Sequence, residues 1–159
     1  MLEPGLVTKA IEDAFPAKGI PEHLRTTSGK KCLDTLLCEE NLLSANWRDI
    51  SFSDVVRNRS CYIFLDVEQQ VEVLPAFLRA FVYSLAQEQG FAWDIFDCLE
   101  SWLRGGARNE IFPLLSHVQR RVIVQSLQVG AQILSSKMAT DEFDDIAEVT
   151  ALADSWHGD

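Results

Sequence analysis

The chain has 159 residues, of which 47% are hydrophobic and 24% charged, and its formal net charge is −10 at pH 7. This length fits one domain, and a domain of this size buries roughly 70% of the surface that its unfolded chain exposes. The negative charge argues against nucleic acids and anionic membranes as partners, because both require a basic protein surface. It is compatible with a basic protein partner, although acidic composition also serves solubility alone.

No apolar run approaches the ~20 residues that a membrane-spanning helix needs. Residues 1–8 lack the basic and apolar segments of a signal peptide, so the expected location is the cytoplasm.

The first predicted helix spans residues 6–15, between Pro4-Gly5 and Pro16, and residues 16–31 form a loop. A second, weaker helix is predicted at residues 33–43, with apolar residues facing inward: Leu33, Leu36, Leu37 and Leu43. Ser51 or Ser53 then caps a brief helical turn. Residues 61–65 are apolar and β-like, but no other segment offers a partner strand, which predicts an extended or 3₁₀ segment packed on the core.

The central element is a strongly amphipathic helix at residues 74–89. Six large apolar side chains recur at helical spacing on one face: Leu74, Phe77, Leu78, Phe81, Val82 and Leu85. Asp66 and Gln69 have the spacing of a capping box and start a preceding helix, which Pro75 is expected to break or kink. Gly90 is expected to end the central helix in the left-handed conformation.

The next predicted helix spans residues 92–104 and ends at Gly105-Gly106. Ser116 and Gln119 form a second capping box, which opens a long helix to about residue 135. Gly130 lies in the middle of that helix, where it costs about 1 kcal/mol relative to alanine, so a neighbouring helix is expected to approach it closely. The predicted fold is therefore all-α: a single-domain bundle of six or seven helices around the helix at 74–89.

The last predicted helix spans about residues 141–156 and is capped by Thr140. Its apolar face comprises Phe143, Ile146, Val149, Ala153 and Trp156, and its outer face comprises Asp141, Asp144, Asp145 and Glu148. The four acidic residues and Trp156 are the predicted partner-binding residues. Two alternatives stay open: the acidic residues form a solvated face, and Trp156 either docks the helix or offers an outward contact.

The four cysteines, Cys32, Cys38, Cys61 and Cys98, form no C-x-x-C pair. They are expected to be reduced core residues, with a disulfide or a metal role as the alternative. The histidines are His23, His117 and His157, and none belongs to a known catalytic motif. No catalytic, cofactor-binding or metal-binding residue is predicted. One alternative is a small enzyme or ligand-binding protein with a site near Cys32, Cys38 and His23, since a thiolate needs a nearby base.

Three stretches together resemble an uncharacterised bacterial family of small, mostly helical proteins. They are Ile11-x-x-Ala14-Phe15-Pro16, Leu74-Pro75-Ala76-Phe77-Leu78, and Leu115-Ser116-x-x-Gln119-Arg120-x-Val122. The resemblance covers about residues 6–134 and excludes the acidic last helix. It implies a helical fold and assigns no catalytic residue. Members of the family often carry a C-x-x-C-like segment, from which the spacing of Cys32 and Cys38 departs.

These observations favour non-catalytic binding of another protein. The concrete form is a bacterial inhibitor or immunity-type protein that neutralises a basic partner through its acidic face. A structural subunit of a homo-oligomer is a further alternative.

Overall fold

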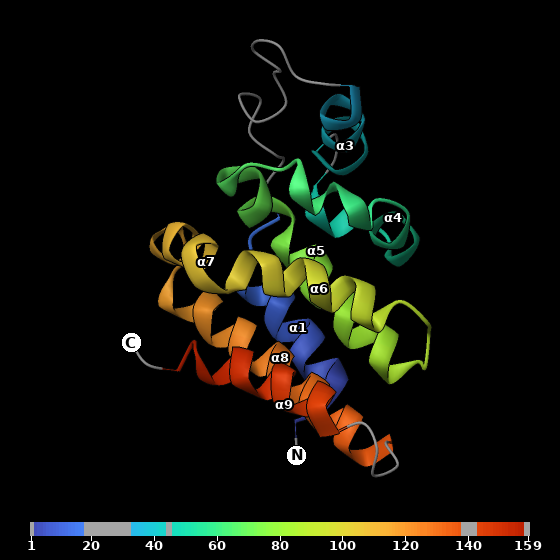
Figure 1. The fold of residues 1–159 in the computed structure, drawn as a ribbon, viewed down its shortest axis with the longest axis vertical. Helices are drawn as coiled ribbons and strands as arrows, with labels where there is room; N and C mark the ends of the chain where they lie inside the picture. The colour runs from blue at the N-terminus through green and yellow to red at the C-terminus, as the bar shows by residue number, and fades with distance from the viewer. Residues whose placement is uncertain (1, 18–32, 44–45, 138–142, 158–159) are drawn as a thin grey trace.

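The computed structural model describes residues 2–17, 33–43, 46–137 and 143–157. Within these ranges the chain forms eight α-helices and three 3₁₀ helices, and no strand (Figure 1). The α-helices are α1 (Pro4–Ala14), α3 (Leu33–Leu43), α4 (Phe52–Arg57), α5 (Val67–Ala86), α6 (Ala92–Leu103), α7 (Gly105–Ile111), α8 (His117–Lys137) and α9 (Phe143–Asp154). The 3₁₀ helices are η1 (Trp47–Asp49), η2 (Arg59–Ile63) and η3 (Phe112–Leu114). The predicted all-α class is confirmed, with more helices than expected.

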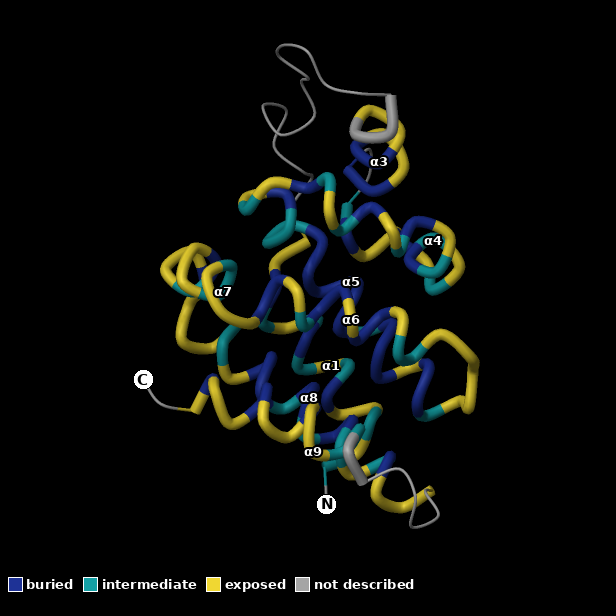
Figure 2. The backbone as a smooth tube through the Cα atoms, viewed as in Figure 1, coloured by how far each residue is buried: buried dark blue, intermediate teal, exposed yellow. Residues whose placement is uncertain are grey.

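Helix α5 is the centre of the core, as predicted. It packs against α1, α6 and α8, and most of its residues between Val73 and Leu85 are buried, drawn dark blue in Figure 2. Phe77 and Phe81 have no exposed surface, and their rings contact Trp102 and Phe96 of α6 at centroid distances of 4.8 Å and 5.8 Å. One continuous cluster of buried side chains therefore joins the central helix to its neighbours.

Pro75 does not break this helix, so the predicted break at this position is wrong. Helix α5 runs for 20 residues with Pro75 buried inside it. It begins at the predicted capping box, in which the Gln69 N–H donates to Asp66 Oδ1 (3.0 Å) and the Asp66 N–H to Gln69 Oε1 (3.0 Å). A proline in a helix interior costs about 3 kcal/mol, and burial of large side chains on both sides of Pro75 offsets that cost.

The end of α5 also differs from the prediction. Glu88, with φ of 55°, takes the left-handed position expected for Gly90. The Gln89 N–H donates to Ser84 O (2.9 Å) and the Glu88 N–H to Leu85 O (3.4 Å), which is the pattern of a Schellman motif. The helix therefore closes three residues before the expected end at residue 89.

In the N-terminal half of the chain, some predictions of helix boundaries and buried residues are confirmed and others are wrong. Pro4 lies inside α1, at a position that tolerates its missing N–H, rather than before the helix. In α3, Leu36 and Leu37 are exposed, contrary to prediction, while Leu42 and Leu43 are buried. The cap at Ser51 is confirmed, because its hydroxyl accepts from the Asp54 N–H. The 3₁₀ alternative for residues 61–65 is confirmed in part by η2.

Helix α6 ends at Leu103, just before Gly105-Gly106 as predicted, but a further helix follows at once. Gly105, with φ of 61°, redirects the chain into the short helix α7, which the sequence did not predict. The second capping box is confirmed: the Gln119 N–H donates to Ser116 Oγ (3.2 Å) and the Ser116 N–H to Gln119 Oε1 (2.9 Å). It opens α8, which runs antiparallel to α9 along one side of the molecule (Figure 1).

No helix in the described ranges combines the length and the apolar character that crossing a bilayer requires.

Candidate functional site

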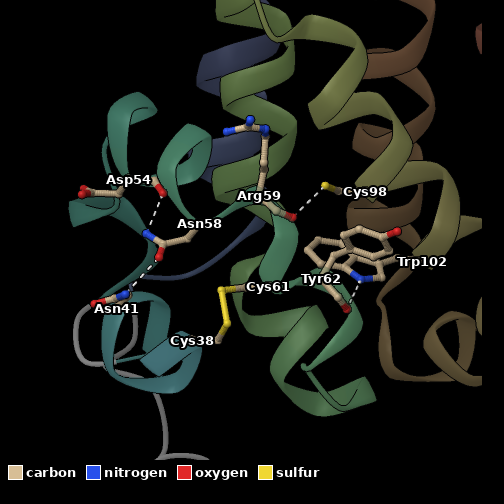
Figure 3. The surroundings of a disulfide bond; sticks show 9 residues. All are labelled: Cys38, Asn41, Asp54, Asn58, Arg59, Cys61, Tyr62, Cys98 and Trp102. Atoms are coloured by element: carbon tan, nitrogen blue, oxygen red, sulfur yellow. Dashed lines mark hydrogen bonds between the residues drawn. A yellow bond between two sulfur atoms is a disulfide. The ribbon is translucent and has the colours of Figure 1, made fainter. Parts of the chain in front are cut away.

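The alternative site near Cys32, Cys38 and His23 is only partly within the described residues. Cys38 is buried and forms a disulfide with Cys61, with 5.5 Å between their Cα atoms (Figure 3). The expectation that these two cysteines are reduced is therefore wrong. Cys32 and His23 lie outside the described ranges. A disulfide sulfur is not a thiolate nucleophile, so Cys38 cannot serve the proposed thiol chemistry while the bond is closed.

The disulfide is part of a connection between α3 and the segment that contains α4 and η2. Beside it, Asn41 Nδ2 donates to Asn58 Oδ1 (3.0 Å), and Asn58 Nδ2 donates to Asp54 O (2.8 Å), as Figure 3 shows. Asn58 is buried, so these bonds satisfy a side chain that would otherwise lose its hydration. This arrangement is structural and positions no reactive group.

Cys98, by contrast, matches the prediction of a small core residue. It is buried in α6, and its thiol lies 3.2 Å from Arg59 O (Figure 3). Burial, with lesser contributions from the Asp97 and Asp94 carboxylates, raises the pKa of this thiol from 9.0 to about 12. The thiol is therefore protonated at neutral pH and unsuited to nucleophilic attack. Within the described ranges, no group of three or more His, Cys, Asp or Glu side chains is arranged to hold a metal ion.

The predicted acidic face lies on the outside of α9. Glu148 is exposed and Asp145 is half-buried. Asp141, the side chain of Asp144 and the predicted cap Thr140 lie outside what the structure describes. Val149, Leu152 and Ala153 of α9 are buried, and the helix packs against α8.

Trp156 docks the last helix rather than facing outward. Only 4% of its surface is exposed, and its Nε1 donates to Leu103 O (2.9 Å) at the end of α6. Its ring also contacts Phe112, with 5.4 Å between centroids. The prediction that Trp156 contacts a partner is therefore corrected: its apolar ring and its N–H are both satisfied within the fold.

An apolar groove, which the sequence did not predict, lies between α1, the start of α4 and the second half of α5. Its volume is about 400 Å³, within the usual range for ligand pockets. Phe52 and the exposed Tyr83 form one wall, with 5.1 Å between their ring centroids. Arg79 lies at the groove but donates to Ile50 O (2.7 Å), so its guanidinium is already engaged. The groove suits an apolar group and offers no catalytic side chain.

Searches against protein-family models, curated proteins and solved structures find no match to this chain.

Proposed function

We propose that this chain is a non-catalytic protein-binding protein that docks a basic partner through the acidic outer face of α9. The single observation that supports the proposal most is the accessibility of acidic side chains on a helix that is otherwise anchored in the core. Val149, Leu152 and Ala153 are buried, whereas Glu148 points to solvent and Asp145 is partly accessible. The buried apolar residues secure the helix against α8, and the Glu148 carboxylate is left accessible to solvent.

The negative charge of α9 is not neutralised by its neighbours in the described ranges. No lysine or arginine there lies within ion-pair distance of Asp145 or Glu148. The nearest cation along the chain, Lys137, is engaged with α5 instead: its Nζ lies 3.1 Å from Glu88 Oε1 and donates to Leu85 O (2.9 Å). Residues 138–159 contain no lysine or arginine. An uncompensated field of this kind attracts and orients a basic partner.

The biological form that we propose is the one expected above, a bacterial inhibitor or immunity-type protein. Membership of the uncharacterised helical family, on the motifs quoted above, also stays a proposal. Neither is needed for the electrostatic argument, which rests on α9 alone.

The redox state of the Cys38–Cys61 pair bears on the location that we propose for the protein. The cytoplasm is the expected location, but disulfides persist chiefly in oxidising compartments, so the Cys38–Cys61 bond favours a compartment outside the reducing cytosol. Thiol trapping in acid-quenched native cells tests this directly. Detection of Cys38 and Cys61 as free thiols would contradict this proposal and support the cytoplasm as the location.

A structural subunit of a homo-oligomer is the second candidate. Leu36 and Leu37 of α3 and Ile63 of η2 are exposed, and each lies within two residues of one end of the disulfide. Exposed apolar side chains near one another are a common feature of subunit interfaces. Light scattering on the purified protein separates this candidate from the first, since a monomer at micromolar concentration excludes it.

The proposed function is tested by affinity capture from an extract of the native cells with three forms of the protein. The variant Asp145→Asn/Glu148→Gln removes two negative charges from α9. The control Asp13→Asn/Glu40→Gln makes the same two changes at exposed positions on α1 and α3. We expect a basic protein retained by the wild type and the control and lost with the α9 variant. Equal retention by all three forms contradicts the proposal.

A further inference from the structure

The first half of α8 and the end of α9 enclose a polar cleft of about 470 Å³. It is distinct from the acidic face, because it lies where the start of α8 meets the C-terminal end of α9 (Figure 1). Its chemically distinctive lining comprises His117, Arg120, Arg121, Gln128 and His157, with Trp156 beneath. In a chain with 24 acidic and 14 basic residues, a hollow lined by two arginines and two histidines is unexpected.

Arg120 is held in place by an aromatic ring. Its guanidinium carbon lies 3.6 Å from the ring centroid of Phe112. Arg108 of α7 contacts the same ring at 4.6 Å and donates to Ser155 O (3.0 Å). The Arg120 Nε is buried, and no acceptor for it occurs among the described residues. A guanidinium fixed by stacking and short of acceptors is preorganised to bind an anion.

The positive charge of the cleft is not balanced by carboxylates in the described ranges. The first turn of α8 carries no acidic residue, and neither Arg120 nor Arg121 forms an ion pair there. Glu110 of α7 and Asp154 of α9 are exposed and pair with neither arginine. The start of a helix adds to the positive potential, because its N–H dipoles point outward.

One histidine of the cleft is also oriented. Gln128 Nε2 and His157 Nε2 lie 2.9 Å apart, which joins the α8 wall to the α9 end across the cleft. The second, His117, is exposed at the opposite rim. Two guanidinium groups and two imidazoles thus surround one hollow. Together they present more donors than the two oxygens of a carboxylate can accept, whereas a phosphate monoester offers three anionic oxygens.

We propose that this cleft binds the phosphate group of a small organic phosphate. Arg120 and Arg121 supply charge and forked donors, and the histidines supply further hydrogen bonds at the rim. The cleft volume lies in the range of small-molecule sites, so it accommodates the phosphate together with a polar organic group. This site is independent of the proposed docking through α9.

The test uses the intact chain, with ribose 5-phosphate as the probe and ribose and acetate as matched controls. Heteronuclear NMR titration is expected to shift the amide signals of residues 117–128 and 157 with ribose 5-phosphate alone. Arg121 is exposed, so Arg121→Gln leaves the fold intact and should weaken binding about 10- to 100-fold, the usual effect of one charge-assisted hydrogen bond. Arg120→Lys keeps the positive charge but removes the planar guanidinium that stacks on Phe112, so it should also weaken binding.

The control Arg57→Gln makes the same change at an exposed position on α4, remote from the cleft (Figure 1). It should leave the dissociation constant of ribose 5-phosphate unchanged. The proposal is overturned by any of three results. The first is that ribose 5-phosphate shifts no amide signal. The second is that Arg57→Gln and Arg121→Gln weaken the binding of ribose 5-phosphate equally. The third is that acetate binds as tightly as ribose 5-phosphate. Binding that appears only with a long polyanion such as heparin would also overturn it, because it indicates a general basic surface.

Discussion

Gly130 of α8 lies directly against the ring of Phe81 of α5. A Cβ placed on Gly130 would be 2.6 Å from Phe81 Cε1 and 2.9 Å from Cζ. Both residues are buried, so any shift of the ring disturbs the side chains packed around it. The contact sets the separation of the two longest helices in the core.

Gly130→Ala is therefore expected to destabilise the protein, although alanine is the better helix former. The propensity gain is about 1 kcal/mol, whereas forcing an extra methyl group into a packed core costs about 1–3 kcal/mol. Urea unfolding at equilibrium measures the difference. Phe81→Ala alone should cost about 3–5 kcal/mol, and the Gly130→Ala change should be better tolerated on that background. A Gly130→Ala variant more stable than wild type would mean that the helices are further apart than described.

The disulfide should contribute measurably to stability. Cys38 and Cys61 are 23 residues apart, and closing a loop of that length stabilises a fold by about 3 kcal/mol. We expect Cys38→Ser/Cys61→Ser to lower the free energy of unfolding by about that amount. Thermal unfolding with and without a reductant provides the check, since the reductant should destabilise the wild type and leave the double variant unchanged. A wild type indifferent to reductant would show that the bond is not formed.

Because the thiol of Cys98 is buried, we predict that the free energy of unfolding depends on pH in the alkaline range. Burial raises the pKa of its thiol to about 12, above the 9.0 of an ordinary cysteine. Between these two values the unfolded chain loses the proton while the folded chain keeps it, so the free energy of unfolding falls as pH rises. The fall is at most about 1.4 kcal/mol per pH unit and is absent below pH about 9. Urea midpoints of wild type and Cys98→Ala should therefore converge as pH rises toward about 10.5. Parallel curves would contradict this assignment.

The acidic face of α9 is not expected to stabilise the fold. Asp145 and Glu148 are three residues apart on one helix, where like charges repel by a few tenths of a kcal/mol. We predict that Asp144→Asn, Asp145→Asn and Glu148→Gln together leave the melting temperature equal or slightly higher. Calorimetry measures it, with Asp13→Asn/Glu40→Gln as the comparison. A clear fall in melting temperature would assign these carboxylates a structural role.

Local chemistry was readable from the sequence. The capping boxes at Asp66–Gln69 and Ser116–Gln119 need only four consecutive residues, and both occur as predicted. The sequence did not indicate that α5 continues through Pro75, because the packing that keeps the helix continuous comes from other helices. Local propensity is overridden in this way wherever burial on both sides outweighs it.

Non-local pairings were equally hidden. The Cys38–Cys61 bond joins residues whose spacing carries no signal of connectivity. The basic cleft forms only because α9 folds back on α8, which brings His157 beside Gln128. His117 and His157 lie far apart in the sequence, and no motif links them. The sequence is compatible with an inward or an outward Trp156, and the hydrogen bond of its Nε1 to Leu103 O shows that it faces inward.

The proposed docking through α9 is tested most directly by association kinetics. Once a captured partner is purified, its association rate constant with wild type and with Asp145→Asn/Glu148→Gln is measured across ionic strengths from about 0.02 to about 0.5 M. We predict that the rate constant for wild type falls steeply with salt, and that the variant associates more slowly with a flatter salt dependence. An association rate indifferent to both the variant and the ionic strength would show that the face of α9 is only a solvated surface.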